Sequence, residues 1–312
     1  MIILPLRARS IATLLLLACI AISAGYAVAD SPRTAPRPAQ GYPTTEAAVE
    51  ALVAAVRAGN VARIGAMLGA GSADLIHSGD PVADQRARER FVASFDRHSK
   101  IDMQGDEKAT LLIGEGEWPF AVPLVKSAGG WHFDASSGAK EFLDRRIGRN
   151  ELAAIQVCLA YVDAQRDYAL TAGASGGVHQ YASKFASTPG KKDGLYWPTA
   201  DGEPLSPLGS LVTQAHAEGY RKQPYHGYYY RILTAQGANA PGGAYDYVVR
   251  GRMIGGFALV AYPAKWGVSG VMTFIVSHDG RVYEKNLGPA TATVAGRMRR
   301  FDPDSSWSEA KP

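Results

Sequence analysis

The two cysteines of this chain are Cys19 and Cys158, and only Cys158 could be a thiol nucleophile of the mature chain. Cys19 lies in an apolar N-terminal run, whereas Cys158 lies near Ile155 and Leu159 on the apolar side of a predicted helix. A reactive cysteine needs an electropositive, partly exposed setting, and a buried free cysteine behaves as a small, inert apolar residue. We therefore interpret Cys158 as a core residue, with a nucleophilic role as the alternative.

The histidines do not show the spacing of a metal site. They are His77, His98, His132, His179, His216, His226 and His278. His132 and Asp134 would share one face of a strand, but a zinc site needs three or four ligands. The GVSG segment at Gly267 lacks the last glycine of a nucleophile elbow. The sequence predicts no catalytic residue, no metal and no cofactor; it leaves enzymatic activity open and favours a non-catalytic protein.

The densest group of aromatic residues is a candidate binding surface. It comprises Trp197, Tyr225, His226, Tyr228 and Tyr230. On a strand, Tyr228 and Tyr230 would share one face. Aromatic rings at such positions either fill a core or stay exposed as contact residues. We keep both interpretations, a binding surface and core packing.

A second candidate group lies in the N-terminal half, where Trp118, Trp131 and His132 come from predicted strands. If the sheet that contains them curves around an open interior, these side chains would line a pocket for a small ligand. An interior filled by side chains would instead favour a structural role for this half of the chain.

The first residues have the layout of a secretory signal. Arg7 and Arg9 precede an apolar run over residues 11–22, and Ala27 and Ala29 offer a small-residue cleavage site. The apolar run is shorter than the ~20 residues that a membrane-spanning helix needs. We predict a signal peptide over residues 1–29, a periplasmic or secreted mature chain and no membrane span after cleavage. A lipid anchor at Cys19 is the alternative.

Charge and composition restrict the possible partners. Cleavage after Ala29 would remove Arg7 and Arg9 and no acidic residue, which lowers the formal net charge from +4 to +2. This small excess does not indicate a nucleic-acid-binding protein. Residues 30–42 are rich in Pro and Ala, which is typical of a flexible linker. The remaining length suggests two domains.

Hydrophobic periodicity in the N-terminal half indicates helices followed by strands. Val49, Leu52, Val53 and Val56 recur at helical spacing after Thr44, a suitable N-cap. We predict helices from Thr44 to Gly59, over residues 61–69 and over 84–95, then strands over 109–114, 118–124 and 131–134. Prolines at 119 and 123 place the middle strand at an edge or give it a bulge.

The C-terminal half begins with a long predicted helix over residues 141–170, which Gly148 could divide. Its apolar stripe comprises Leu152, Ile155, Leu159 and Val162. Strands are predicted over residues 228–234, 245–251, 257–262, 271–277 and 282–285, with Asp279-Gly280 as a hairpin turn. The fold class predicted is α+β, with two domains, 43–139 and 140–312, each packing N-terminal helices on an antiparallel sheet.

Two fold resemblances follow from this order of elements. Residues 43–139, with EWPFAVPLVK and GGWHFD, resemble the nuclear-transport-factor-2-like cone. The long helix with GYYYRIL and FALVAYPAKWGVSGVMTFIVSHDGRVY resembles the globular part of type IV pilin-like proteins. A true pilin joins this helix directly to its export segment, whereas a whole domain intervenes here.

Six phrases spread over the predicted mature chain are long and specific: EWPFAVPLVK, RRIGRNE, KKDGLYWP, PYHGYYYRIL, GVSGVMTFIV and FDPDSSW. On these phrases, the mature chain as a whole is similar to a bacterial family described as domain of unknown function 2950. We expect a non-catalytic scaffold, adaptor or assembly factor of the cell envelope, with an envelope protein as partner and the second sheet as contact surface. The alternative is a periplasmic enzyme or small-ligand-binding protein that uses the N-terminal cone. The oligomeric state stays open.

Overall fold

The computed structural model of the protein describes residues 40–175, 178–222 and 224–311. The predicted signal peptide, its cleavage after Ala29 and the alternative lipid anchor at Cys19 lie outside these residues, as does most of the predicted linker. Within the described ranges, no helix combines the length and the apolar character needed to cross a bilayer.

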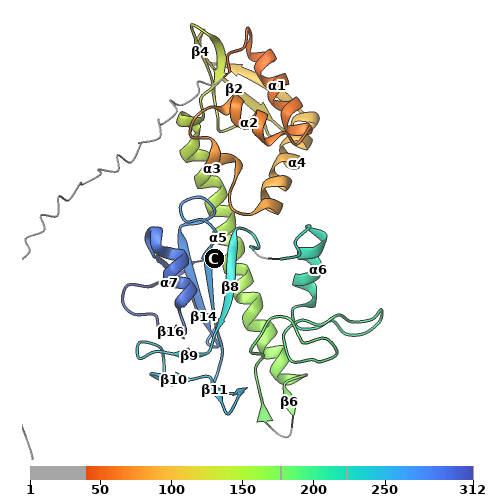
Figure 1. Cartoon of the computed structure of the whole chain (residues 1–312), viewed down its shortest axis with the longest axis vertical. Helices are drawn as coiled ribbons and strands as arrows, with labels where there is room; N and C mark the ends of the chain where they lie inside the picture. The colour runs from red at the N-terminus through yellow and green to blue at the C-terminus, as the bar shows by residue number, and fades with distance from the viewer. Residues whose placement is uncertain (1–39, 176–177, 223, 312) are drawn as a thin grey trace, which may run out of the picture. The chain divides into compact units, whose positions relative to one another are not determined.

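Four helices open the described part of the chain (Figure 1). They are α1 (Thr45–Arg57), α2 (Val61–Leu68), α3 (Ala73–Ile76) and α4 (Pro81–Arg97). The Thr44 hydroxyl accepts the N–H of Ala47 at 3.1 Å and caps α1 as predicted. Gly59 follows the end of α1 with a φ of 61°, which glycine adopts without strain. Val49 and Leu52 of the predicted stripe are buried.

An antiparallel sheet follows these helices. Its strands are β1 (Ser99–Met103), β2 (Lys108–Ile113), β3 (Trp118–Pro119), β4 (Leu124–Ser127) and β5 (Gly130–Phe133). Their order in the sheet is β1-β2-β4-β5. Strand β3 pairs with the C-terminal end of β2, whereas β4 pairs with its N-terminal end. The strand predicted over residues 118–124 is therefore divided in two. Pro119 and Pro123 lack backbone donors, and although Phe120 still donates its N–H to the carbonyl of Leu111 at 2.8 Å, Ala121 and Val122 leave the ladder in a bend.

Helix α5 (Ala135–Leu170) runs through Gly148 without a break, so the predicted division there is wrong. One glycine in a helix interior costs only about 1 kcal/mol relative to alanine. Leu152, predicted in the buried stripe, is 55% exposed. At that level Glu151 faces the sheet instead, and its carboxylate accepts the backbone N–H groups of Val271 and Met272 at 2.8 and 2.9 Å.

The C-terminal sheet packs on α5. Its strands are β8 (Tyr228–Leu233), β13 (Ala258–Pro263), β14 (Met272–Ser277), β15 (Val282–Asn286) and β17 (Ser308–Glu309), in the antiparallel order β17-β15-β14-β13-β8. Asp279 makes the predicted turn between β14 and β15, because its carboxylate accepts the hydroxyl of Ser277 and the N–H of Arg281. Four of the five strands predicted in this half are thereby confirmed within one or two residues.

Shorter elements complete the C-terminal half. They are β6 (Ala174–Ser175), β7 (Val178–His179), α6 (Gly209–Ala217), β9 (Ala235–Gln236), β10 (Tyr245–Asp246), β11 (Val248–Val249), β12 (Arg252–Met253), η1 (Gly288–Ala290), α7 (Thr291–Arg297) and β16 (Arg300–Phe301). The strand predicted over residues 245–251 is β10 and β11, which pair with β9 and β12 respectively.

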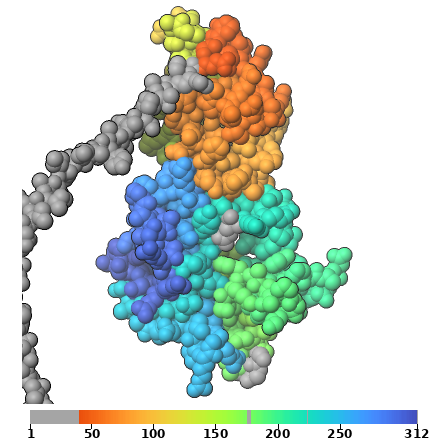
Figure 2. Space-filling model, in the orientation of Figure 1, coloured from red at the N-terminus to blue at the C-terminus, as the bar shows by residue number. Residues whose placement is uncertain are grey.

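Helices and mainly antiparallel sheets confirm the α+β class. The buried apolar residues form two clusters, one among α1 to β5 and the start of α5, the other among the later elements. We call these groups the N-terminal lobe and the C-terminal lobe. Side chains of α1 to α4, coloured orange, form a continuous surface on the face drawn in Figure 2. The division into two domains at residue 139 stays a prediction, and that position lies inside α5.

A buried carboxylate joins the start of α4 to the C-terminal lobe. Asp80 is 1% exposed, and one of its oxygens accepts the N–H of Ala83 at 2.9 Å as the N-cap of α4. The other oxygen accepts the hydroxyl of Tyr220 at 2.9 Å and the N–H of Gly227 at 2.8 Å. A buried carboxylate is tolerated only when its lone pairs are used in this way.

Replacing Asp80 is expected to destabilise the protein strongly. Asp80→Ala removes a cap and two charge-assisted bonds, so the free energy of unfolding in urea should fall by about 3 kcal/mol or more. Tyr220→Phe should lower it by about 2 kcal/mol, and by much less in the Asp80→Ala background. Glu89→Ala, an exposed change on the same helix, is the control. Equal unfolding midpoints for Asp80→Ala and Glu89→Ala would contradict this role.

Candidate functional site

A cavity of about 430 Å³ lies in the N-terminal lobe, bounded by α4, the sheet and the first half of α5. This volume falls within the range of small-molecule sites. Its apolar lining residues are Leu52, Val56, Ile64, Leu68, Leu75, Ile76, Phe91, Ile113, Phe120, Val122 and Phe142. The rings of Phe91 and Phe120 lie 5.3 Å apart and join α4 to the segment between β3 and β4.

The cavity results from the way in which α4 packs on the sheet. Although α4 is 17 residues long, it has no fully buried residue, whereas α1 buries six over 13 residues. Its sequence, PVADQRARERFVASFDR, is mostly charged or polar, and its apolar stripe of Ala83, Ala87, Phe91 and Phe95 includes two small alanines. An interior between a helix and a sheet is normally filled by a stripe of larger apolar side chains. Here α4 covers the sheet without filling the space beneath it.

Arg146 is the buried arginine of this site, and its guanidinium group is already engaged in contacts within the fold. It is 9% exposed and donates to the backbone carbonyl of Asp74 at 2.6 Å and to that of Leu75. Its guanidinium also lies 5.0 Å from the centre of the Phe142 ring. Burial lowers the pKa of Arg146. This side chain therefore attaches α3 to α5 and forms part of the cavity wall.

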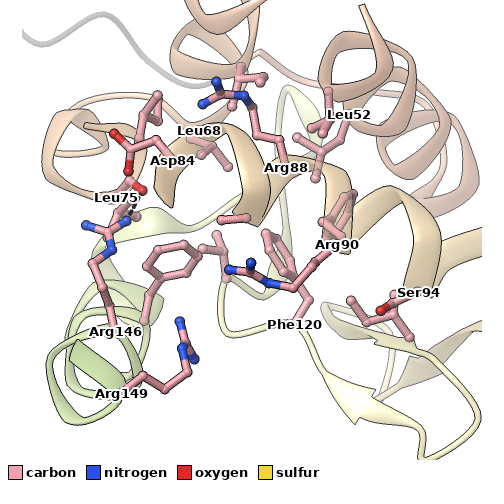
Figure 3. A pocket seen from close by; sticks show the side chains of 18 residues that line it. Leu52, Leu68, Leu75, Asp84, Arg88, Arg90, Ser94, Phe120, Arg146 and Arg149 are labelled. Carbon is pink, nitrogen blue, oxygen red and sulfur yellow. Dashed lines mark hydrogen bonds between the residues drawn. The ribbon is translucent and has the colours of Figure 1, made fainter. Parts of the chain in front are cut away.

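Arg90 from α4 and Arg149 from α5 differ from Arg146, because neither has a hydrogen-bond or ion-pair partner among the residues that the structure describes. Figure 3 shows their guanidinium groups pointing toward one another at the cavity, while Arg88 points a different way. Throughout the described ranges, no carboxylate lies within ion-pair distance of either group. Burial, and then the positive charges of Arg90 and Arg145, lower the pKa of Arg149.

The other polar residues of the lining are already engaged or are weakly reactive. The Asp84 carboxylate accepts the N–H of Ser78 at 3.0 Å. Ser94 accepts a hydrogen bond from Arg97 at 3.4 Å. A nucleophile needs a base within hydrogen-bond reach, and neither contact supplies one. The arrangement suits binding of an anion next to an apolar surface.

The structure places the predicted pocket residues outside this cavity. Trp118 is 70% exposed and lines an adjoining hollow of about 370 Å³, which shares Ser94 and Ile113 with the cavity. Trp131 is buried in the core of the N-terminal lobe. His132 lies 3.5 Å from the hydroxyl of Ser127. Asp134 does not join His132 but caps α5, where it accepts the N–H of Ser137 at 3.1 Å.

The sequence prediction missed the arginines of the cavity. They lie in two short runs, RARER at residues 86–90 and RRIGR at 145–149, each on a segment that we predict to be helical. Two arginine-rich runs on different helices were the available signal. Nothing in either run indicates that Arg90 and Arg149 converge, since that depends on how α4 and α5 pack.

The predicted aromatic surface is divided by the structure. Tyr228 and Tyr230 are buried in the C-terminal core, and the Tyr228 hydroxyl donates to the carbonyl of Met272 at 3.0 Å. Tyr225 is also buried, next to His226 with ring centres 4.1 Å apart. Trp197 lines a separate hollow, with the Lys192 ammonium 5.4 Å from its ring centre.

His226 has an uncommon backbone conformation, with a φ of 49°. Its ring is half-buried beside Tyr225, and its Nε2 lies 3.6 Å from a carboxylate oxygen of Glu218. Burial lowers the pKa of His226, although the charges of Glu218 and Asp80 oppose that effect. Protonation of His226 is therefore less favourable in the folded protein than in the unfolded chain.

Cys158 lies in the core of the C-terminal lobe with no exposed surface. Burial raises the pKa of its thiol to about 12. The thiolate is the reactive form, so this residue remains a neutral thiol near neutral pH.

These features define an α+β protein with an apolar cavity bordered by arginines. The chain belongs to the family described as protein of unknown function (DUF2950), whose model matches residues 39–310. No curated protein and no solved structure matches the chain. The cone-like and pilin-like resemblances therefore stay predictions.

Alkylation should distinguish a core cysteine from a reactive one. At about pH 8, iodoacetamide should modify Cys158 in the folded protein at least about a hundredfold more slowly than in urea, because access requires the core to open. Mass spectrometry of the peptide that contains Cys158 measures both rates. Similar rates in the two states would contradict the buried position.

Stability should depend on pH through His226. Because its pKa is lower in the folded state, the unfolded chain binds more protons below about pH 6.5, and stability should fall as the pH drops through that value. His226→Asn, which tolerates the positive φ, should reduce the loss of Tm between about pH 7.5 and 5.5. His77→Asn, an exposed change, is the control. An unchanged pH profile in His226→Asn would show that other groups cause the loss.

Proposed function

We propose that this protein binds a small organic ligand in the cavity of its N-terminal lobe and acts as a binding protein rather than an enzyme. The observation that carries this proposal is the apolar space under α4, bordered by Arg90 and Arg149, whose guanidinium groups have no partner among the described residues. Concave, mostly apolar spaces with a few convergent polar groups are typical of ligand sites. Because we also predict an export signal, we propose that binding takes place outside the cytoplasm.

The C-terminal sheet supports this proposal over a scaffold that uses that sheet as its contact surface. In β13 only Tyr262 is not fully buried, and in β14 only Met272. Successive residues of a strand point to opposite faces, so continuous burial requires both faces to be covered. Helices α5 and α7 both pack on this sheet. A partner protein would therefore have little access to the faces of these two strands, although β17, at the edge of the sheet, is exposed.

The chemistry of the cavity lining supports binding over catalysis. Acid–base or nucleophilic catalysis requires a donor or base held within reach of a substrate atom. Among the lining residues, Asp84 and Ser94 are the groups with such chemistry, and each is engaged with a neighbour in the fold. The guanidinium groups can bind and orient an anion but cannot act as a base at neutral pH.

Filling the cavity should abolish ligand binding. Ala87 lines the cavity from α4 and is itself exposed, so Ala87→Trp should block the space with little effect on folding. Ala93→Trp, at an exposed position of α4 outside the lining, is the matched control. Affinity for a neutral fluorophore such as N-phenylnaphthylamine, measured by fluorescence titration, should fall by about tenfold or more in Ala87→Trp, about 1.4 kcal/mol.

The control variant should bind the fluorophore as the unchanged protein does. Equal affinity in Ala87→Trp, with an unchanged circular dichroism spectrum, would contradict the proposed location. Failure of the unchanged protein to bind any apolar probe would contradict the proposed function itself.

A further inference from the structure

We infer that the ligand is an anionic amphiphile, with one carboxylate or phosphate headgroup between Arg90 and Arg149 and an apolar chain in the cavity below them. This inference rests on the proposed function and specifies the chemical class of its ligand. It uses the position of the two guanidinium groups, the apolar lining and the engagement of the remaining polar groups.

Arg90 and Arg149 place two positive charges at the mouth of the cavity. Arg90 and Arg149 come from different helices, and their guanidinium groups lie close enough for the charge of one to act on the other. Two like charges that point toward one another repel, and because both side chains are exposed to solvent, water weakens that repulsion without removing it. The described part of the chain supplies no acidic side chain to offset it. An anion bound between them removes this repulsion.

The second step is the geometry of the donors. A guanidinium group presents planar N–H donors that match the oxygens of a carboxylate or a phosphate. Arg88 and Arg146 are not placed to bind the same headgroup. Arg88 points away from the pair, and Arg146 already donates to the carbonyls of Asp74 and Leu75. The headgroup therefore has two arginines as partners.

The third step is the surface beneath this pair. Phe91, Phe120 and Phe142 line the same cavity, together with aliphatic side chains from α1 to α3 and β2. A ligand with polar groups along its whole length would leave them without partners in this space, which costs free energy for each group. The part of the ligand below its headgroup is therefore apolar.

The test compares ligands that share one chain and differ in headgroup. Decanoate, decyl phosphate, decanol and decyltrimethylammonium are titrated into the full chain by calorimetry, each below its micelle-forming concentration. At least one of the two anions should bind about tenfold or more tightly than decanol, and the cation should bind more weakly than decanol. The order of the two anions identifies the headgroup. Affinity for the anion should fall as the salt concentration rises.

Variants of the pair locate the headgroup. Arg90→Gln and Arg149→Gln should each weaken binding of the anion by about tenfold to a hundredfold and leave decanol almost unchanged. Arg88→Gln is the matched control, because it lines the same cavity and removes the same charge. Retained anion affinity in both pair variants, or an equal loss in Arg88→Gln, would overturn the assignment of the headgroup site.

The outcomes separate this inference from the proposed function. Equal affinity for decanol and both anions, with loss of all of them in Ala87→Trp, would leave the cavity as a ligand site and overturn the inference about charge. Absence of binding by all four compounds and by the neutral fluorophore would instead contradict the proposed function.

Discussion

The buried carboxylate of Asp80 is the interaction on which the rest of the arrangement depends. It caps α4 and accepts hydrogen bonds from Tyr220 and Gly227 of the C-terminal lobe. Because an unpaired charge inside a protein is strongly destabilising, α4 cannot slide or turn without losing one of these bonds at a large cost. The first turn of α4 is thereby fixed in position, and Phe91 and Phe95, which pack against the core of the N-terminal lobe, hold the rest of the helix.

That constraint explains how a polar helix can cover an apolar space. Helix α4 is held at one end by Asp80, and Arg146 attaches α3 to α5 on the other side of the cavity. Arginines from both walls then reach the same opening, and Arg90 and Arg149 remain without partners within the described part of the chain. In the free protein, the unfilled space loses packing contacts and the two arginines repel one another. A bound anionic amphiphile would fill the space with its chain and offset the repulsion with its headgroup.

Sequence reasoning predicted the elements whose signals are local. The stripe of α1 with its Thr44 cap, and the Asp279 turn between two apolar strands, follow from spacing alone. Strand β1 was missed because its sequence, SKIDM, is mostly exposed and pairs with β2 without an apolar face of its own. The site was missed for a related reason, because the convergence of Arg90 and Arg149 is a property of packing between α4 and α5. The α+β class was thus predictable, while the arginine-bordered cavity was not.

A crystal structure of the full chain with decanoate or decyl phosphate would test the central claim most directly. We expect electron density for the headgroup within hydrogen-bond distance of both Arg90 and Arg149, with the apolar chain of the ligand lying against Phe120 and Phe142. Density for the ligand only at another surface, or an N-terminal lobe in which α4 has closed onto the sheet and filled the cavity with its own side chains, would contradict it.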